Sequence, residues 1–204
     1  MSRLTDLAER LSALEPRAVE DPARRQAAVA IVLAPDPDRL LLIRRAEHPR
    51  DPWSGQMGLP GGRREAIDRD LVATALRETR EELGLDLSGA PLAGALDDLA
   101  PNTPVLPPIV VRPYVFLLHQ APEAFTLSGE VQYARWVELA ELSRPEIYRP
   151  YAFEHLGVRM SRPGYHLGDD VVWGMTERIL TPLLRLLGAP IPEIDFWRIT
   201  VSGG

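Results

Sequence analysis

The spacing of apolar residues divides the chain into segments typical of helices and strands. Leucines recur every three or four positions from Leu4 to Leu14, which predicts an amphipathic helix over residues 3–15. Two apolar runs follow, at 27–34 and 39–45, with a turn rich in proline and aspartate between them. Such a pair of runs predicts a β-hairpin.

A second helix is predicted in the middle of the chain, over residues 68–83. Its apolar positions, from Val72 to Leu83, form one stripe at helical spacing, and Gly84 provides a C-terminal stop. Three segments lead into this helix: a polar loop, a short apolar run and a glycine-bearing turn, at 46–54, 55–59 and 60–62.

The C-terminal half predicts further strands and a last helix. Strand-like runs occur at 91–97, 109–119 and 131–137, and apolar spacing places the helix at 173–187. Strands interleaved with helices favour an α/β sandwich with a mixed sheet. We expect an N-terminal helix with its lead-in, one main domain, and a tail along the surface, at residues 1–25, 26–188 and 189–204.

Composition narrows the function. The net charge of −6 argues against a surface for long nucleic acids, so we expect a small-molecule ligand. The chain has no cysteine, which excludes disulfides and thiolate chemistry. It has no apolar run of membrane-spanning length and no signal-like start, so we expect a cytoplasmic protein without a membrane partner. A homodimer is compatible with the sequence.

The second predicted helix carries a cluster of carboxylates. Glu78, Glu81 and Glu82 stand at positions i, i+3 and i+4, so their side chains project from one face. Their mutual repulsion is relieved by a hard cation such as Mg²⁺, while Arg77, four residues before Glu81, can hold one carboxylate in place. The alternative is a solvated helix face, which is the common role of such residues.

The turn before this helix strengthens the first interpretation. Gly61 and Gly62 permit positive φ angles and close backbone approach, and such a turn can present N–H groups to phosphate oxygens. We therefore expect both glycines to bind substrate. A plain turn is the alternative, and the combination with the carboxylate helix favours the site.

At this point the chain resembles the Nudix hydrolase family. The signature of the family is a glycine, five residues, a glutamate, seven residues and then Arg-Glu-apolar-any-Glu-Glu-any-Gly-apolar, and residues 77–85 match its second half except at Thr79. Five residues after Gly62 stands Asp68 instead of glutamate, and eight residues then separate it from Arg77. Asp68 is either an outer ligand or the helix N-cap. The resemblance implies an α/β/α sandwich with a mixed sheet.

The resemblance also implies roles for the carboxylates. Glu78 and Glu82 would bind Mg²⁺ or Mn²⁺, and Glu81 would be a ligand or would position the attacking water. Glu130, at the head of a predicted strand, matches a loop carboxylate that binds metal or acts as base in such enzymes, with a solvated turn residue as the alternative. Glu81, Glu130 and Arg77 form the expected catalytic set.

One branch of the family, the coenzyme A pyrophosphatases, resembles the chain most. Its motif before the signature is similar to the stretch that contains Arg44, Arg50 and Gly55, although four residues instead of three separate Arg50 from Gly55. We expect Arg44 and Arg50 to bind substrate, because a guanidinium offers a fork to phosphate. Trp53 would stack on adenine or cover the loop, and Trp173 would lie in the last helix and pack in the core.

The resemblance implies Mg²⁺-dependent hydrolysis of the diphosphate linkage in a nucleoside diphosphate derivative. The first candidate is coenzyme A or acyl-coenzyme A, cut to 4′-phosphopantetheine and adenosine 3′,5′-bisphosphate. The second is ADP-ribose, a dinucleoside polyphosphate or an oxidised nucleotide. The third is a domain that binds a nucleotide without hydrolysing it.

Overall fold

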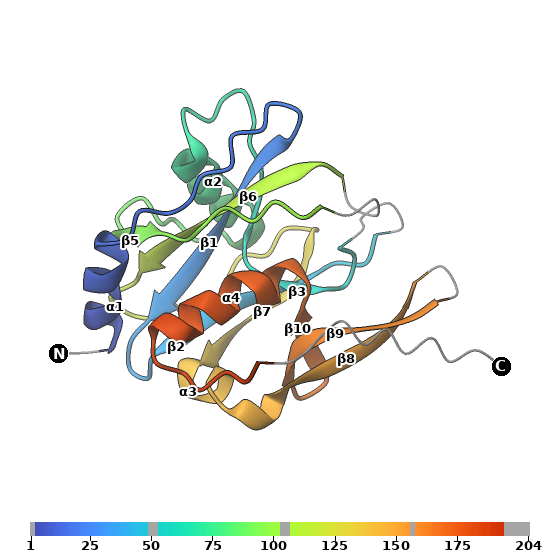
Figure 1. The fold of residues 1–204 in the computed structure, drawn as a ribbon. Coiled ribbons are helices and arrows are strands. Elements are labelled where there is room, and N and C mark those ends of the chain that lie inside the picture. Colours follow the sequence, from blue (N-terminus) through green and yellow to red (C-terminus); the bar gives the residue numbers. More distant parts are fainter. Residues whose placement is uncertain (1–2, 49–52, 103–106, 156–157, 194–204) are drawn as a thin grey trace.

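The computed structural model describes residues 3–48, 53–102, 107–155 and 158–193. A mixed sheet lies at the centre, with helices packed on both of its faces (Figure 1). This confirms the expected α/β/α sandwich. Seven strands of the described residues form the sheet: β1 (Arg25–Ala34), β2 (Arg39–Arg45), β3 (Met57–Gly58), β4 (Gly61–Arg63), β5 (Leu92–Ala95), β6 (Ile109–Leu117) and β7 (Val131–Glu138).

Strand β1 is the axis of the sheet. It pairs with β6 in parallel over all but its last residue, from Arg25 opposite Ile109 to Leu33 opposite Leu117. Its first half also pairs antiparallel with β4, and its last residues form the predicted hairpin with β2. Because it has neighbours on both sides and layers on both faces, β1 is apolar at consecutive positions from Ala27 to Ala34.

The helices divide between the two faces. α2 (Leu71–Leu83) covers one face, where Ala75 and Leu83 pack on alternate residues of β1 and β2. The opposite face packs against α4 (Met175–Leu186) and α1 (Arg3–Ser12), which bury their leucines in a second, larger cluster. α1 also donates hydrogen bonds from Arg3 and Arg10 to carbonyl oxygens at the end of α4. No helix of the described residues is long and apolar enough to cross a membrane.

A second sheet of three antiparallel strands was not predicted. It consists of β8 (Tyr148–His155), β9 (Val158–Leu167) and β10 (Asp170–Trp173), and it follows the short helices α3 (Leu139–Leu142) and η1 (Pro145–Ile147). Pro150 lies opposite Pro163 in the β8–β9 ladder. Proline has no N–H to donate in a ladder, so a proline inside an apolar run argues against a strand. The two prolines therefore explain why β8 and β9 were not predicted.

Several predicted boundaries were wrong by a few residues. The first helix ends at Ser12, so Leu14 is exposed, and the last begins only at Met175, which leaves Trp173 in β10. The turn at 60–62 is in part a strand, because Gly61–Arg63 pairs with β1. Residues 189 and 191 of the expected surface tail are buried, while 194–204 lie outside the described residues.

Candidate active site

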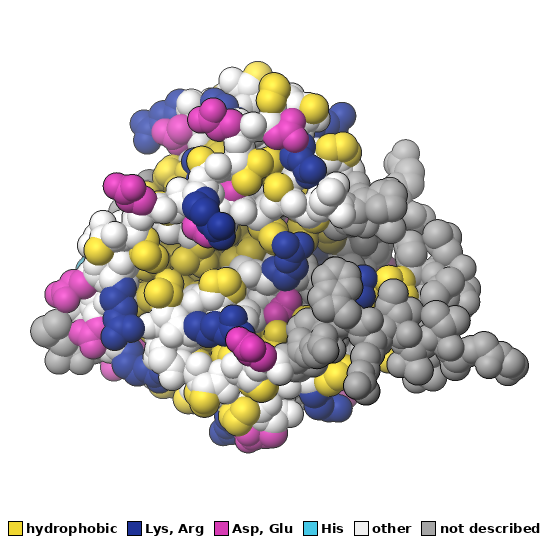
Figure 2. Space-filling view, in the orientation of Figure 1, with side chains coloured by type: hydrophobic (Ala, Val, Ile, Leu, Met, Phe, Trp, Pro, Cys, Tyr) yellow, Lys and Arg dark blue, Asp and Glu magenta, His cyan; other side chains and the backbone are white. Residues whose placement is uncertain are grey.

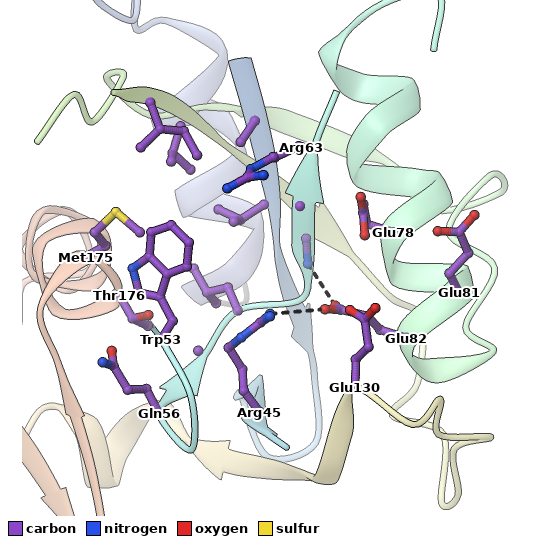
Figure 3. Close-up of a pocket in the computed structure, with 18 of the residues that line it drawn as sticks. Arg45, Trp53, Gln56, Arg63, Glu78, Glu81, Glu82, Glu130, Met175 and Thr176 are labelled. Carbon is purple, nitrogen blue, oxygen red and sulfur yellow. Dashed lines mark hydrogen bonds and ion pairs between the residues drawn. The ribbon is translucent and has the colours of Figure 1, made fainter. Parts of the chain in front are cut away.

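A pocket of 690 Å³ opens between the C-terminal half of α2 and the start of α4. Carboxylates from α2 line one wall, and Trp53, Met175 and Thr176 lie across from them (Figure 3). Alternate residues of β1 and β6, including Ala27 and Val111, form an apolar floor. In Figure 2 hydrophobic side chains lie in a hollow near the middle of the face, with arginine and acidic side chains around it.

Glu82 is the most deeply buried of the pocket carboxylates, with 3% of its surface exposed. The backbone N–H of Gly61 donates to its Oε2 at 2.9 Å, and Arg45 Nη1 lies 3.6 Å from its Oε1 (Figure 3). Burial nevertheless raises the pKa of Glu82 to about 8, and the neighbouring Glu78 and Glu130 add to the rise. An ionised Glu82 at neutral pH therefore requires a further positive charge nearby.

Arg45, and not Arg44, is the β2 arginine in the pocket. Successive residues of a strand point to opposite faces, so Arg45 shares the face of Leu41 and Ile43, under α2. Arg44 points the other way, where its Nη1 lies 3.4 Å from Asp170 Oδ1. Arg44, which we expected to bind substrate, is therefore not brought into this pocket, because strand alternation turns it to the other face.

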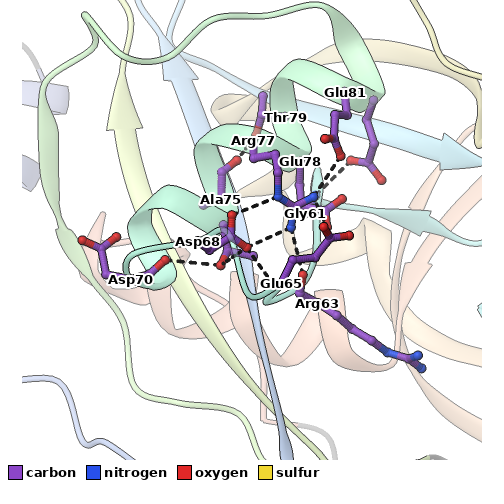
Figure 4. Close-up of polar contacts among 12 residues, drawn as sticks. Gly61, Arg63, Glu65, Asp68, Asp70, Ala75, Arg77, Glu78, Thr79 and Glu81 are labelled. Carbon is purple, nitrogen blue, oxygen red and sulfur yellow. Dashed lines mark hydrogen bonds and ion pairs between the residues drawn. The ribbon is translucent and has the colours of Figure 1, made fainter.

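Arg77, in the middle of α2, is the centre of a polar cluster (Figure 4). Its Nε and Nη2 donate to the two carboxylate oxygens of Asp68 at 3.0 Å each, and Nη2 also donates to the Arg63 carbonyl. Its Nη1 donates to Glu78 at 3.0 Å and to Glu81 at 2.9 Å. These bonds use all five donors of a guanidinium. Arg77 thus has no donor left for a substrate, and the geometry makes it a positioning residue instead of a catalytic one.

Asp68 is the anchor of Arg77 and not the N-cap of the helix. Besides the two bonds from Arg77, its carboxylate accepts from the Thr74 hydroxyl and the Glu65 N–H. The hydrogen bonds from Arg77 hold the pKa of Asp68 at about 2, below its usual 3.8. The N-cap is Asp70, whose Oδ1 accepts from the Ala73 N–H at 2.7 Å. Because Asp68 faces Arg77, the geometry gives it no place among the ligands.

At both glycines another group approaches too closely for a side chain: the Glu78 carboxylate at Gly62 and the β1 backbone at Gly61. A Cβ on Gly62 would lie 2.4 Å from an oxygen of Glu78, and a Cβ on Gly61 would lie 2.3 Å from the Ala28 carbonyl oxygen. Gly61 also has φ of 146°, which disfavours any side chain. Its N–H donates to Glu82, so the hydrogen bond that we expected for a phosphate oxygen is made here to a carboxylate oxygen.

Glu78 and Glu81 differ in burial, although both accept a bond from Arg77. Glu78 is partly buried, and burial raises its pKa despite the adjacent guanidinium. The Glu81 side chain is 59% exposed and reaches the pocket rim. Thr79 fills the apolar slot between them without cost, because its hydroxyl donates to the Ala75 carbonyl of its own helix at 2.7 Å.

The loop before β7 brings Glu130 to the same pocket. The N–H of Ser128 donates to the Glu82 carbonyl, and the Glu130 carbonyl accepts from the Ala46 N–H. These two bonds attach the loop to the end of α2 and to the end of β2. Glu130 is exposed, and its charge helps to raise the pKa values of Glu78 and Glu82.

The carboxylate oxygens are the type of ligand that a divalent cation prefers, but they do not lie close enough together to form a complete coordination site. Within the described ranges, no three acidic or histidine side chains approach closely enough to hold an ion. The donors on this wall are all carboxylate oxygens, and their mutual repulsion opposes ionisation of the buried members. Oxygen donors that face substrate space and retain room for water are what Mg²⁺ and Mn²⁺ favour.

The two tryptophans singled out in the sequence lie in different parts of the structure. Trp53 lines the pocket, so stacking on a base and covering the loop both remain consistent with its place. Trp173 packs on Tyr151 and Phe153 of β8, with ring centroids 5.4 and 4.5 Å away. Arg50 lies outside the described residues.

Comparisons with known proteins agree with this geometry. The family model of the NUDIX domain matches residues 24–155. The chain is 32% identical over 193 residues to a Nudix hydrolase named NudL from Enterobacter sp. strain 638, covering 91% of this chain and 95% of that protein. It is 40% identical to a Schizosaccharomyces pombe protein, C14C4.10c, over 52% of this chain, but spans only 34% of that longer protein.

A solved structure shares the fold. The Nudix hydrolase RenU from M. smegmatis superposes with a TM-score of 0.54 at 19% identity, over 84% of this chain and 90% of that one. The family model covers more than half of the chain, and the Enterobacter relative matches nearly its full length. The chain therefore belongs to the Nudix hydrolase family.

Proposed function

We propose that this Nudix hydrolase cleaves the diphosphate linkage of coenzyme A or acyl-coenzyme A, to 4′-phosphopantetheine and adenosine 3′,5′-bisphosphate, with Mg²⁺ or Mn²⁺ as cofactor. The observation that carries the hydrolysis is the convergence of Glu78, Glu82 and Glu130 on one pocket, with burial opposing the ionisation of the first two. Raised carboxylate pKa values in a pocket are typical of functional sites.

Each part of the pocket has a distinct task in this proposal. Glu78 and Glu82 hold the divalent cation, while Arg77 and the Gly61 N–H fix their carboxylates. When bound, the cation neutralises the diphosphate and lowers the pKa of a water molecule. Glu130 or the exposed Glu81 accepts the proton of the attacking water at a carboxylate oxygen. Arg45 adds a positive charge beside the diphosphate.

The shape of the pocket is consistent with a long substrate. Its volume lies within the roughly 300–1,000 Å³ typical of small-molecule sites, and its apolar wall lies opposite the carboxylates. A diphosphate at the acidic wall leaves the apolar wall to an adenine ring or to the pantetheine arm. We choose coenzyme A over other diphosphates because the chain resembles the coenzyme A pyrophosphatases between Leu41 and Gly62. The aspartate at position 68 and its distance along the chain from Arg77 also point to that branch of the family.

Product analysis on a substrate panel tests this proposal. The purified protein is incubated with Mg²⁺ and coenzyme A, acetyl-coenzyme A, ADP-ribose, a dinucleoside polyphosphate and an oxidised nucleoside triphosphate, and the products are identified by mass spectrometry. We expect 4′-phosphopantetheine and adenosine 3′,5′-bisphosphate as the fastest-formed products. Preferred cleavage of another member would overturn the choice of coenzyme A, and tight binding without cleavage of any member would support the binding-only alternative.

A further inference from the structure

A second hollow adjoins the active-site pocket on its β4 side. It has a volume of 490 Å³, and three arginines, Arg25, Arg63 and Arg64, contribute to its lining. Arg63 lines both this hollow and the larger active-site pocket. Figure 3 shows its guanidinium directed into the active-site pocket. The two hollows thus meet at one exposed cation.

Strand register sets Arg25 beside Arg63. Ala27 lies directly opposite Arg63 in the β1–β4 ladder, and Arg25 lies two residues before Ala27 on β1. Side chains two residues apart on a strand share a face, so Arg25 and Arg63 are diagonal neighbours at a spacing of about 7–8 Å. An anion between them can accept hydrogen bonds from both guanidinium groups.

These two arginines are not used by the fold. Neither Arg25 nor Arg63 makes a side-chain hydrogen bond or ion pair with any residue that the structure describes. Arg64 differs, because it donates to the Gln26 side chain and to the carbonyl oxygens of Asp68 and Arg69. Arg64 therefore holds the loop, while the other two remain available.

The local charge also favours an anion. The chain has no lysine, so each of the three cations that line the hollow offers the bidentate fork of a guanidinium. Of the acidic residues that line the hollow, Asp68 is neutralised by Arg77, and only Glu65 opposes the three arginines. A compact positive site next to an acidic pocket suits a ligand that carries two separate phosphate groups.

We infer that Arg25 and Arg63 form a subsite for a phosphomonoester that the substrate carries in addition to its diphosphate. The inference rests on the proposed function, since it takes the diphosphate to lie at the carboxylate wall. In a nucleotide, this extra phosphate is esterified to the ribose at its 2′ or 3′ oxygen. Arg63, at the junction of the two hollows, then selects such nucleotides over those with an unmodified ribose.

Binding of reaction products tests the subsite without turnover. Isothermal titration calorimetry in Mg²⁺ buffer compares adenosine 3′,5′-bisphosphate, adenosine 2′,5′-bisphosphate and AMP, which differ only in the extra phosphate. We expect the preferred bisphosphate to bind about tenfold more tightly than AMP, as one or two charge-assisted hydrogen bonds supply. The two bisphosphates distinguish a 3′ from a 2′ phosphate.

Arg63→Ala and Arg25→Ala should each reduce this preference severalfold, and the double variant should reduce it to about one, since the contacts that provide it are removed. Arg69→Ala is the matched control, because Arg69 is an exposed arginine of the same loop that lines neither hollow. Circular dichroism verifies the fold of every variant. An equal affinity of the wild type for all three nucleotides, or a preference that survives in the double variant, overturns the subsite.

The proposed function fails by a different result. If the function is right but the protein does not recognise the extra phosphate, coenzyme A and its 3′-dephospho form are hydrolysed with Mg²⁺ at the same kcat/KM. If the function is right but other residues recognise that phosphate, the two values differ and the difference survives in the double variant. If the function is wrong, neither is hydrolysed, whatever the affinities of the bisphosphates. The two measurements therefore separate the two claims.

Discussion

The guanidinium of Arg77 determines where two of the site's carboxylates lie. All of its donors are occupied, two of them by Asp68, so its orientation is fixed before any ligand binds. The sequence pattern identified Arg77 but not this anchor, because Asp68 stands one position away from the expected glutamate spacing. The Asp68 carboxylate nevertheless reaches Arg77 and accepts from its Nε and Nη2 at 3.0 Å each.

Asp68→Asn should lower the free energy of unfolding by about 1–3 kcal/mol near neutral pH, because the amide cannot match the charged hydrogen bonds. The bonds from Arg77 lower the pKa of Asp68 from 3.8 to about 2. Its stabilisation is therefore complete above 3.8 and is lost as the pH falls toward 2. Urea unfolding of both proteins over this range should show the difference shrinking with acid. A difference that grows with acid would refute the assignment.

Gly62→Ala should displace the Glu78 carboxylate and reduce kcat. The new Cβ would lie 2.4 Å from a Glu78 oxygen, and this side-chain end can move aside without breaking the backbone. We therefore expect a melting temperature close to that of the wild type together with slower hydrolysis. Gly89→Ala is the control, because its Cβ would meet nothing within 4 Å. Wild-type kcat in Gly62→Ala would show that the position of Glu78 is unimportant.

At the scale of helices and strands, the sequence predicts those elements that a local pattern of apolar and turn residues encodes. The β1–β2 hairpin, α2 and its glycine stop follow from apolar spacing and turn residues, and all three are confirmed. The second sheet escaped prediction because its strands contain facing prolines. Strand parity shows that Arg44 and Arg45 point to opposite faces, but only the packing of α2 decides which face holds the site.

Helix α4 carries a buried glutamate that sequence spacing alone does not explain. Glu177 accepts hydrogen bonds from Tyr148 and Thr181 at 2.7 and 2.8 Å, and Tyr165 bonds to Thr181. Burial raises the pKa of Glu177 above its usual 4.5. This network joins α4 to β8 and β9.

Glu177→Gln should raise the melting temperature at neutral pH. The raised pKa means that the wild type is most stable below 4.5 and loses this stability as ionisation sets in with rising pH. Glutamine keeps an acceptor oxygen without the charge, so its advantage should vanish in acid. Glu177→Leu should instead lose about 2 kcal/mol, because it leaves hydroxyl groups unpaired. Thermal melts of the wild type and both variants across this pH range measure the differences. The account would be contradicted if the melting temperature of Glu177→Gln, relative to that of the wild type, were lower at neutral pH than in acid.

At the scale of the whole molecule, Asp170 joins the two sheets. From β10 it accepts a hydrogen bond from Tyr133 of β7 and forms ion pairs with Arg44 at 3.4 Å and Arg135 at 3.2 Å. Asp170 is buried, whereas the two arginines are partly exposed. The small sheet leads directly into α4, which supplies Met175 and Thr176 to the pocket. Asp170 thus connects the main sheet to the element that forms the apolar wall.

Asp170→Ala should lower the free energy of unfolding by about 2–3 kcal/mol, somewhat less than for a fully buried pair, because the arginines retain some water. Asp169→Ala, at the exposed neighbouring position, should change it by less than about 0.5 kcal/mol. Chemical denaturation of both variants measures this. Equal effects at the two positions would show that Asp170 does not join the sheets.

The central claim is that the buried carboxylates of α2 hydrolyse a diphosphate linkage with a divalent cation, and Glu82→Gln tests it most directly. Glutamine preserves the shape and can accept the Gly61 bond, and it removes a charge that burial disfavours, so the melting temperature should match or exceed that of the wild type. Mg²⁺-dependent release of phosphomonoester products from coenzyme A, followed by chromatography, should be lost. Undiminished turnover in this folded variant would remove Glu82 from the mechanism.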